Sequence, residues 1–263
     1  MDWSKEKNYF LAAMMFFTRF PVSTLTPTTP YSDKILYHSR KYFPFIGVLI
    51  GCLAALIIYL SNLVLPLILA IVLSILATVL ATGAFHEDGF ADCCDGFGGG
   101  WSKEEILTIM KDSRVGTYGV VGLVLLFSLK IFTLYELGNT SLSLLLACCV
   151  NGHALSRLGA SLSAEKLDYV QNIDKSKIKP ITNKSLPTKS LIFSASLTAP
   201  SILFLLTFDS IYIFAAIPML SIFILGNRYF KKHIGGYTGD CLGAMQQTLE
   251  VVFYLSILIL NTI

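Results

Sequence analysis

Long apolar segments are the feature that most constrains the fold of this chain. Mostly apolar stretches of 17 or more residues cover about 43–64, 65–85, 119–135, 142–162, 190–208, 211–227 and 241–263. A helix of about 17 to 25 apolar residues spans the hydrocarbon core of a bilayer. We therefore expect an all-α fold, a polytopic membrane helical bundle of about seven transmembrane helices plus short interfacial helices. It would form a single integral membrane domain over residues 1–263.

The composition agrees with a membrane protein and excludes several other classes. Of the 263 residues, 54% are hydrophobic and 14% are charged, whereas soluble domains are about a quarter charged. The net charge of +3 is too small to indicate binding to nucleic acid. None of the six cysteines stands in a CxxC spacing, so no zinc site is indicated. The expected partner is the lipid bilayer.

Lysines and arginines are distributed unevenly between the two sides of the predicted membrane. The segment before residue 43 and the connections 86–117, 157–189 and 228–240 contain 19 of the 20, whereas the connections near 62–66, 136–141 and 208–210 contain none. Because cytoplasmic loops are enriched in Lys and Arg, we expect the basic connections and the N-terminus inside and the C-terminus outside. Lys130, the exception, lies toward the outer end of the third span, and we expect it to snorkel.

The segments between the spans differ in character. Ser102 and Glu105 have the capping-box spacing that begins a helix, which predicts an interfacial helix over 103–112. We expect this helix to be part of a cytoplasmic acidic loop over 86–117 that contains a metal site. The other connections are expected as an interfacial helix over 8–20, a loop over 21–42, a basic cytoplasmic loop with six lysines over 163–189, and a basic, glycine-containing loop over 228–239.

The stretch from His86 to Gly96 is the main candidate for chemistry. It places four carboxylates within nine residues, directly after an apolar run. In a helix, Asp88, Asp92 and Asp95 share one face, and like charges at that spacing repel one another unless a cation lies between them. Oxygen-only ligands favour Mg²⁺, which also binds phosphate oxygens. These three aspartates are therefore the predicted metal ligands, and a solvated acidic helix end is the alternative.

Two further groups carry polar side chains suited to phosphate. Asp112 and Arg114 lie just before the third span, and arginine presents a planar fork to phosphate oxygens. An exposed charge pair is the alternative there. Asn151, His153 and Arg157 lie in the inner half of the fourth span, where ionisable groups are candidates for function. A snorkelling arginine is the alternative for Arg157.

The last group precedes the final span. Gly-Gly-Tyr-Thr-Gly-Asp runs over 235–240, and a glycine-rich turn before a helix N-terminus can bind an anion. Thr238 or Asp240 can also cap that helix, which explains part of the pattern without a ligand. Asp240, Gln247 and Glu250 then form a polar stripe on an otherwise apolar helix.

The residues alone predict an integral membrane protein with a site for Mg²⁺ and phosphate at its inner surface. The sequence has no Walker lysine motif and no Ser-His-Asp order. Phosphotransfer suits such a site, because a metal offsets negative charge on the diphosphate and the leaving nucleotide while an alcohol attacks the phosphorus atom. His86 is a candidate base or a candidate hydrogen-bond donor to phosphate, and a structural histidine is the alternative.

Five motifs follow one another over nearly the whole chain. They are Thr-Arg-Phe-Pro-Val over 18–22, Phe-Pro-Phe-Ile-Gly over 43–47, His-x-Asp-Gly-x-Ala-Asp-x-x-Asp-Gly over 86–96, Met-Lys-Asp-Ser-Arg-Val-Gly-Thr-Tyr-Gly over 110–119 and Gly-Gly-Tyr-Thr-Gly-Asp-Cys-Leu-Gly-Ala over 235–244. In this order they resemble the cobalamin synthase family. The third and fifth motifs are specific, whereas the basic loop 163–189 carries no signature of that family.

The resemblance implies the last assembly of the nucleotide loop of cobalamin. In that reaction adenosylcobinamide-GDP reacts with α-ribazole or its 5′-phosphate, and the products are adenosylcobalamin or its phosphate, and GMP. The resemblance also implies Mg²⁺ as cofactor and a multi-pass location in the prokaryotic cytoplasmic (inner) membrane, with the active site facing the cytoplasm. A homo-oligomer is compatible with the sequence, which does not fix the oligomeric state.

On this resemblance each candidate residue has an expected role. Asp88, Asp92 and Asp95 bind Mg²⁺ and, through it, the diphosphate. His86 or Asp112 takes the proton from the attacking ribazole hydroxyl. The expected substrate-binding residues are Arg114, Asn151, Arg157, Thr238 and Asp240. Of these, Arg114 and Arg157 would hold phosphate, and Asp240 would complete the metal site or bind the incoming nucleoside.

Two rival classes remain. CDP-alcohol phosphotransferases and prenyltransferases also use clustered aspartates in membrane helices. The run Asp-Gly-x-Ala-Asp departs from the Asp-Gly-x-x-Ala-Arg start of the former, and 86–96 lacks the Asp-Asp-x-x-Asp form of many prenyltransferases. A cobinamide or cation transporter predicts ionisable residues that face one another in mid-membrane, whereas this sequence gathers them on one side.

Overall fold

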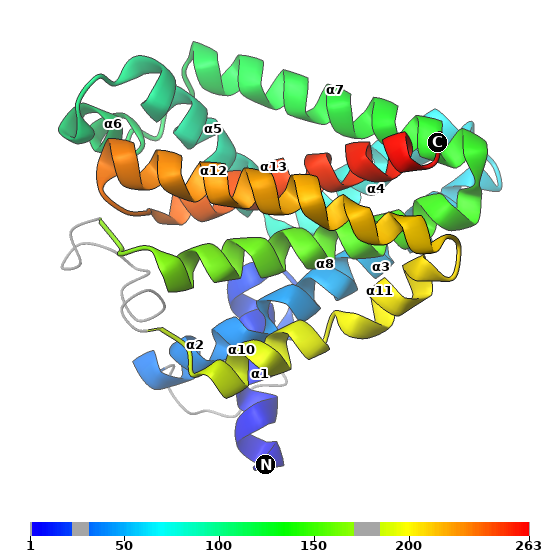
Figure 1. Ribbon diagram of the computed structural model, residues 1–263, viewed down its shortest axis with the longest axis horizontal. Helices are drawn as coiled ribbons and strands as arrows, with labels where there is room; N and C mark the ends of the chain where they lie inside the picture. The colour runs from blue at the N-terminus through cyan, green and yellow to red at the C-terminus, as the bar shows by residue number, and fades with distance from the viewer. Residues whose placement is uncertain (1, 23–31, 171–184, 263) are drawn as a thin grey trace.

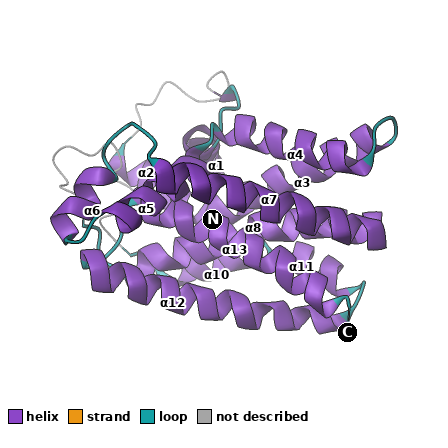
Figure 2. Cartoon of the chain, turned by 90° about the horizontal axis from the view of Figure 1, so that it is seen from above, coloured by secondary structure: helices purple, strands orange, loops and turns teal. Residues whose placement is uncertain are grey.

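The structure, a computed structural model, describes residues 2–22, 32–170 and 185–262. Its helices are α1 (Trp3–Phe17), α2 (Asp33–Ser39), η2 (Arg40–Tyr42), α3 (Phe43–Asn62), α4 (Leu67–Thr82), α5 (Phe85–Gly99), α6 (Lys103–Ile109), α7 (Thr117–Thr140), α8 (Leu142–Lys166), α10 (Thr188–Ser196), α11 (Ala199–Leu206), η4 (Ser210–Ala215), α12 (Ala216–Ile234) and α13 (Gly239–Leu260). Figure 2 shows helices and loops but no strand. In the described ranges the only extended pairing is an isolated bridge between Tyr169 and Tyr237. The all-α prediction is confirmed.

The long helices run back and forth as a bundle (Figure 1). Within the described residues, six helical stretches are long and apolar enough to cross a membrane, and α4 with α5 makes a seventh if this bent pair counts as one span. The polytopic architecture is therefore confirmed. The bend between α4 and α5 is 90° and contains Gly83 at φ 70° and Ala84 at φ 56°. Such a left-handed conformation costs a residue with a side chain about 1 kcal/mol, so packing must hold Ala84 there.

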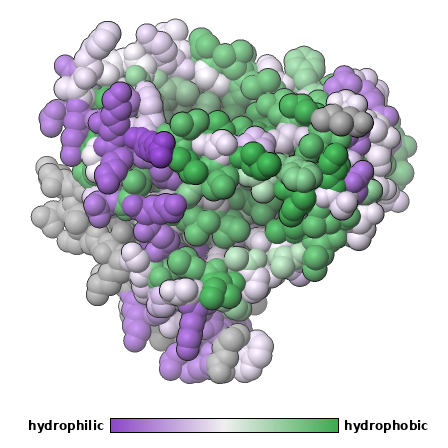
Figure 3. Space-filling model, in the orientation of Figure 1, coloured by the Kyte–Doolittle hydropathy of each residue, from purple (hydrophilic) through white to green (hydrophobic). Residues whose placement is uncertain are grey.

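The two ends of the bundle differ in polarity. We call the left-hand end in Figure 1 the acidic end, where α5, α6 and the first turns of α7 and α13 lie together. Hydrophilic side chains gather mainly toward that side of the molecule in Figure 3, and hydrophobic ones cover much of the rest of this face. At the opposite end the connections 63–66, 141 and 207–209 contain no Lys or Arg.

α8 and α13 form the centre of the bundle. Of the 18 most apolar consecutive residues in each helix, 61% are buried in α8 and 67% in α13. In the other four unbent candidate spans the buried share is 44% or less. Gly47 and Gly51 of α3 lie so close to the α8 backbone that neither position has room for a side chain. Gly152 of α8 likewise makes room for Tyr254 of α13. Small residues thus let the central helices pack closely, as is usual in membrane bundles.

Several helices extend further than the sequence predicted. The expected loop 21–42 is wrong over 33–42, where α2 and η2 lead directly into α3. The expected loop 228–239 is wrong up to Ile234, because α12 continues to that residue. Lysines in its last turn, such as Lys231, interact favourably with the negative end of the helix dipole. A run of basic residues therefore did not mark the end of the helix.

Other expectations hold with small changes. α6 begins where the capping box predicted, and both hydrogen bonds between Ser102 and Glu105 are present. The fifth span is split into α10 and α11 near Pro200, which stands in the first turn of α11 because proline lacks the amide hydrogen that a helix interior needs. The expected basic loop 163–189 is wrong at its ends, because α8 continues to Lys166 and α10 begins at Thr188. Its residues 171–184 lie outside the described part of the chain.

Lys130 does not snorkel, contrary to the expectation. Its side chain is buried, and its Nζ lies 2.9 Å from Oε1 of Glu250 and donates to Oε1 of Gln247 at 2.5 Å. Glu250 also lies 3.2 Å from Nδ1 of His153. The polar stripe of α13 thus gives the ammonium group partners inside the bundle, so it has no need to reach the interface.

Replacing Lys130 by methionine tests this ion pair. Lys130→Met leaves the buried Glu250 carboxylate with one cation fewer, and breaking a buried pair from one side costs about 3–5 kcal/mol. The midpoint of thermal unfolding in detergent should fall clearly, and Lys130→Met/Glu250→Gln should recover part of the loss. The exposed control Lys189→Met should leave the midpoint unchanged. Equal midpoints for wild type and Lys130→Met would contradict this account.

Candidate active site

α5 carries the acidic stretch as a helix, as predicted. Asp88 is exposed, Asp92 is half-buried and Asp95 is buried. Glu87 is buried on another face, where its Oε1 accepts a hydrogen bond of 3.0 Å from Nε2 of Gln247. Glu87, the fourth carboxylate of the stretch, therefore lies apart from the three aspartates.

Two glycines bring α5 against the first turns of α13. A side chain at Gly89 would come within 2.9 Å of the Cα atom of Asp240, and one at Gly243 within 3.0 Å of the carbonyl oxygen of His86. Without side chains at these positions, the two backbones can approach closely. Asp240 of α13 consequently lies beside the aspartates of α5.

Four carboxylates meet around this contact. Asp92 lies within electrostatic range of Asp240, Asp88 and Asp95. Over the described part of the chain, none of the four forms an ion pair with a lysine, arginine or histidine. Because like charges repel, a bound cation would stabilise this arrangement.

Asp95 has a second role that the sequence did not predict. Its Oδ2 accepts a hydrogen bond of 2.7 Å from the amide of Gly116, and its Oδ1 accepts one of 2.8 Å from the amide of Gly119. Amides at the N-terminus of a helix have no partner within the helix, so Asp95 caps α7. A side chain at either glycine would collide with this carboxylate. The cap leaves Asp95 fewer lone pairs for a metal ion than Asp88 or Asp92.

The side chains at this contact suit Mg²⁺ by their chemistry but do not form a complete cage. Asp88, Asp92 and Asp240 offer carboxylate oxygens that no cation neutralises. Among the residues that the structure describes, no three His, Cys, Asp or Glu groups converge enough to hold a metal ion alone. Mg²⁺ usually binds one or two carboxylates together with waters and substrate phosphates. The residues therefore fit an ion whose coordination a phosphate-bearing substrate completes.

The turn between α6 and α7 forms an open pocket beside Asp95. Its volume is about 560 Å³, and Thr108, Arg114 and Thr117 line it. Arg114 donates from Nη2 to Oδ2 of Asp112 at 2.6 Å and from Nε to Oδ1 at 3.0 Å. These hydrogen bonds lower the pKa of the exposed Asp112 to about 2. A carboxylate with so low a pKa is a weak proton acceptor.

The two candidates on α8 lie in different surroundings. Arg157 is buried behind α5, within electrostatic range of Glu87, and its Nη1 donates to the carbonyl oxygen of His153 at 3.0 Å. Asn151 instead donates to the carbonyl oxygen of Ser201 at 3.0 Å and so joins α8 to α11. The structure therefore places Arg157 near the acidic helix and gives Asn151 a structural contact elsewhere.

Thr238 and His86 flank the contact between α5 and α13. Thr238 caps α13 as predicted, since its Oγ1 accepts from the amide of Cys241 at 3.2 Å and lies 3.3 Å from Oδ2 of Asp240. His86 is 2% exposed, and neither of its ring nitrogens has a hydrogen-bond partner among the described residues. It stands two residues before Asp88, which places the two side chains on different faces of α5.

A buried polar network behind the aspartates was not predicted as a unit. It joins α5, α7, α8 and α13 through Glu87, Lys130, His153, Ser156, Gln246, Gln247, Glu250 and Tyr254. The polar stripe on α13 indicated two of its eight members, Gln247 and Glu250. Lys130 was missed as a member, because a lysine in an apolar span was interpreted as a snorkelling residue.

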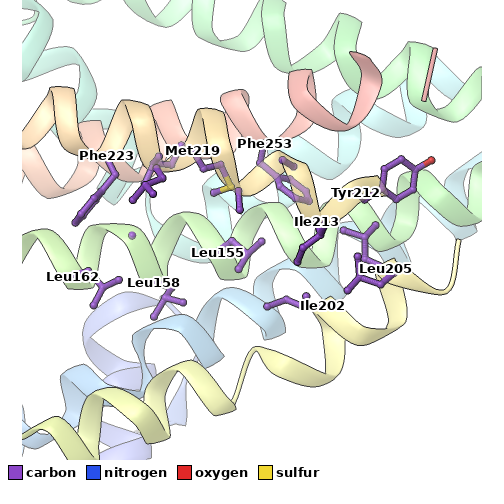
Figure 4. Close-up of a pocket in the computed structure, with 16 residues that line it drawn as sticks. Leu155, Leu158, Leu162, Ile202, Leu205, Tyr212, Ile213, Met219, Phe223 and Phe253 are labelled. Carbon is purple, nitrogen blue, oxygen red and sulfur yellow. The ribbon is translucent and has the colours of Figure 1, made fainter. Parts of the chain in front are cut away.

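An apolar pocket of about 330 Å³ lies away from these residues, between α8, α11, η4, α12 and α13. Figure 4 shows Leu155, Leu158 and Met219 around this space. No charged side chain lines it. A phosphate would therefore have no partner there, and this pocket is not the candidate active site.

Removing the carboxylate of Asp95 tests its role as a cap. Asp95→Ala frees the first amides of α7, and the loss of a helix cap costs about 0.5–2 kcal/mol. Thermal unfolding without Mg²⁺ should show a lower midpoint for Asp95→Ala. The exposed Asp88→Ala, which removes only repulsion, should leave the midpoint unchanged or higher. An Asp95→Ala protein as stable as wild type would show that the cap contributes nothing.

Comparison with known proteins agrees with these motifs. A model of the cobalamin-5-phosphate synthase family matches residues 9–258. The adenosylcobinamide-GDP ribazoletransferase of Shewanella frigidimarina is 45% identical to this chain and covers 98% of it, over 97% of its own length. Proteins of the same name from Shewanella amazonensis and Leptospira interrogans are 42% and 40% identical, over 98% and 96% of this chain and 97% and 96% of their own lengths. No solved structure matches the chain. Because the family model and these relatives match nearly its whole length, the chain belongs to the cobalamin-5-phosphate synthase family.

Proposed function

We propose that this protein transfers the cobinamide-phosphate group of adenosylcobinamide-GDP to a ribose hydroxyl of α-ribazole or α-ribazole 5′-phosphate. A bond forms between the ribose oxygen and the phosphorus atom attached to cobinamide. The bond from that phosphorus to the oxygen of GMP breaks, GMP leaves, and the hydroxyl loses its proton. The products are adenosylcobalamin or its 5′-phosphate, and GMP. Family membership and the activity for which the relatives are named support this reaction.

The observation that carries the proposal is the cluster of carboxylates that no cation neutralises, next to an open pocket. Asp92 lies near Asp88 and Asp240, and Asp95 joins this cluster to the pocket at the start of α7. A diphosphate is negatively charged, so it can approach such carboxylates only with a cation between them. The positive end of α7 and the guanidinium of Arg114 favour an anion on the pocket side.

We propose Mg²⁺ as the cofactor, held by Asp88, Asp92 and Asp240. Asp95 contributes the carboxylate lone pairs that its hydrogen bonds to the start of α7 leave free. When bound, the ion offsets negative charge on the diphosphate and on the departing GMP. Oxygen ligands at the contact of α5 and α13, without a competing lysine or arginine, support this choice of metal.

Arg114 is the residue we propose for holding the diphosphate. It is exposed at the mouth of the pocket, and its fork, which now binds Asp112, can exchange that carboxylate for phosphate oxygens. Arg157 lies behind α5, and Asn151 is bonded to the backbone of α11. These two residues therefore suit a supporting role better than direct contact with phosphate.

A carboxylate of the cluster is the proton acceptor that we favour. Asp112 binds a proton weakly while Arg114 holds its carboxylate, because its pKa is then about 2. His86 is buried, and its side chain lies on a different face of α5 from the exposed Asp88. Asp88 is the most accessible carboxylate of the cluster. The oxygen of Asp88 that does not bind the ion is the one best placed to receive the proton of the hydroxyl.

We also propose that the acidic end faces the cytoplasm from the inner membrane of a prokaryotic cell. The connections at this end carry lysines and arginines, and the turns at the opposite end carry none. Basic connections stay on the cytoplasmic side during insertion. Soluble nucleotide substrates would then reach the pocket at the α6–α7 turn directly.

One feature expected of a transporter is present. Lys130, His153 and Glu250 face one another inside the bundle, contrary to the expectation that ionisable residues gather on one side only. These groups bond to one another, and Glu250 also accepts from Gln246 at 2.6 Å. A network that satisfies its own charges suits the support of a site better than transport, and the comparisons favour the transferase.

The decisive assay measures GMP. Purified protein, adenosylcobinamide-GDP, α-ribazole and Mg²⁺ should release one GMP for each adenosylcobalamin formed. Omission of α-ribazole should stop the release, because the leaving group departs only when the hydroxyl attacks. Release of GMP at the same rate without α-ribazole would show hydrolysis and would contradict the proposed transfer.

Asp92→Asn tests the metal site with two readouts. Transfer should fall at least about 100-fold, because the carboxamide is a poorer Mg²⁺ ligand. Mg²⁺ should raise the unfolding midpoint of wild type, since a ligand of the folded state stabilises it, and this rise should vanish in Asp92→Asn. The matched control is Glu104→Gln, an exposed acid on α6. Near-normal turnover and an unchanged Mg²⁺ effect in Asp92→Asn would remove Asp92 from the site.

A further inference from the structure

A small cavity lies beside the first turn of α13, next to the aspartates. Its volume is about 60 Å³, and α1, α3, α5, α8 and α13 enclose it. Its aromatic wall consists of Phe16, Phe17, Phe43, Phe85 and His86. Small residues of α8 and α13, among them Ala164 and Gly243, complete the lining. We call it the aromatic cavity.

The aromatic rings of this wall are already stacked. The ring centroids of Phe17 and Phe43 are 4.2 Å apart at 26°, and those of Phe43 and His86 are 5.7 Å apart at 19°. Phe85 meets His86 edge-on, with centroids 5.3 Å apart. Rings held in this order present flat faces and edges to which another flat ring is attracted.

His86 gives the aromatic cavity one unsatisfied polar group. It is 2% exposed, and both ring nitrogens lack a hydrogen-bond partner among the described residues. Arg40, which also lines the cavity, is paired with Glu165. A buried imidazole without a partner costs free energy and indicates a missing ligand or water. The cavity therefore offers flat apolar walls, the unpartnered nitrogens of His86 and the hydroxyl of Ser161.

The volume and the position of the aromatic cavity limit which ligands it can bind. A volume of about 60 Å³ holds about four waters, which is close to the size of one aromatic ring. Gly239 and Gly243 line the cavity, and Asp240 stands between them on the first turn of α13. A ring bound here would place a substituent at that turn, beside the carboxylates of the candidate metal site.

We propose that the aromatic cavity binds the benzimidazole base of the incoming nucleoside, with an N–H of His86 donating to the free ring nitrogen of the base. This inference rests on the proposed function, which supplies that nucleoside. One ring of the base fills the cavity, and the ribose reaches the first turn of α13. His86 is then a substrate-binding residue and not the proton acceptor.

The guanine of the other substrate does not suit this cavity. Guanine carries several donors and acceptors along its edges, and phenylalanine walls would leave them unpaired at a cost in affinity. Benzimidazole in a nucleoside has a single free ring nitrogen and is otherwise apolar. The pocket of Figure 4 also has a polar group, the hydroxyl of Tyr212, but this hydroxyl already donates to Oδ1 of Asn261 at 2.8 Å. It is therefore less suited than the unpartnered His86 to orient a base.

His86→Phe tests the hydrogen bond. The variant keeps a ring on Phe43 but removes both nitrogens. The KM for α-ribazole should rise about tenfold, as expected for one lost hydrogen bond, while kcat and the KM for adenosylcobinamide-GDP stay within about twofold. A proton acceptor would behave differently, since its loss lowers kcat by about 100-fold or more. A fall of that size in kcat, with an unchanged KM for α-ribazole, would overturn the proposal.

Ala164→Leu tests the shape of the aromatic cavity. It still tests the proposal if His86→Phe does not fold. The larger side chain should narrow the cavity, raise the KM for α-ribazole about tenfold or more, and weaken the binding of α-ribazole alone, measured by its fluorescence. The matched control is Ala216→Leu, which adds the same atoms at the pocket of Figure 4. It should leave both values unchanged.

The two levels of the proposal fail separately. If wild type releases no GMP, the proposed function is wrong. If wild type turns over but Ala164→Leu and every folded His86→Phe sample bind α-ribazole as wild type does, only the aromatic cavity is wrongly assigned. Equal effects of Ala164→Leu and Ala216→Leu would also overturn it, because the change would then not be local to the cavity.

Discussion

The close contact between α5 and α13 is the interaction on which the site depends. Gly89 and Gly243 remove side chains from this contact, so the helix that carries Asp88 and Asp92 lies against the helix that carries Asp240. The 90° bend after α4 turns the chain into that position. Gathering carboxylates is unfavourable in itself. Among the described residues no lysine, arginine or histidine pairs with them, and this is the reason for proposing an added cation.

The buried network fixes the rotation of α5 about its own axis and so decides which of its side chains face outward. Glu87 accepts from Gln247, Gln247 accepts from Lys130, and Lys130 pairs with Glu250. Buried ion pairs are weak evidence of stability, because desolvation offsets much of their attraction. Here the geometry suggests a role in orientation. Glu87 precedes Asp88 directly, so holding Glu87 inside the bundle turns Asp88 outward.

The spans and the acidic helix were predictable because apolar length and helical spacing are local properties. The pairing of Lys130 was not, since its partner Glu250 is far along the chain and only the packing of α7 on α13 joins them. The second role of Asp95 was hidden for another reason. Its partners are backbone amides, which leave no mark in a sequence except the small residues Gly116 and Gly119 that make room for it. The unpaired state of His86 depends on five helices and had no local signal.

The central claim is that the carboxylates of α5 and α13 form one cation site that holds the diphosphate. Electron–nuclear double resonance with Mn²⁺ in place of Mg²⁺ tests it most directly. With adenosylcobinamide-GDP bound, the protein-bound Mn²⁺ should show coupling to phosphorus. Both the bound Mn²⁺ and this coupling should be lost in Asp92→Asn/Asp240→Asn. Bound Mn²⁺ without phosphorus coupling, or an unchanged spectrum in the double variant, would contradict the account.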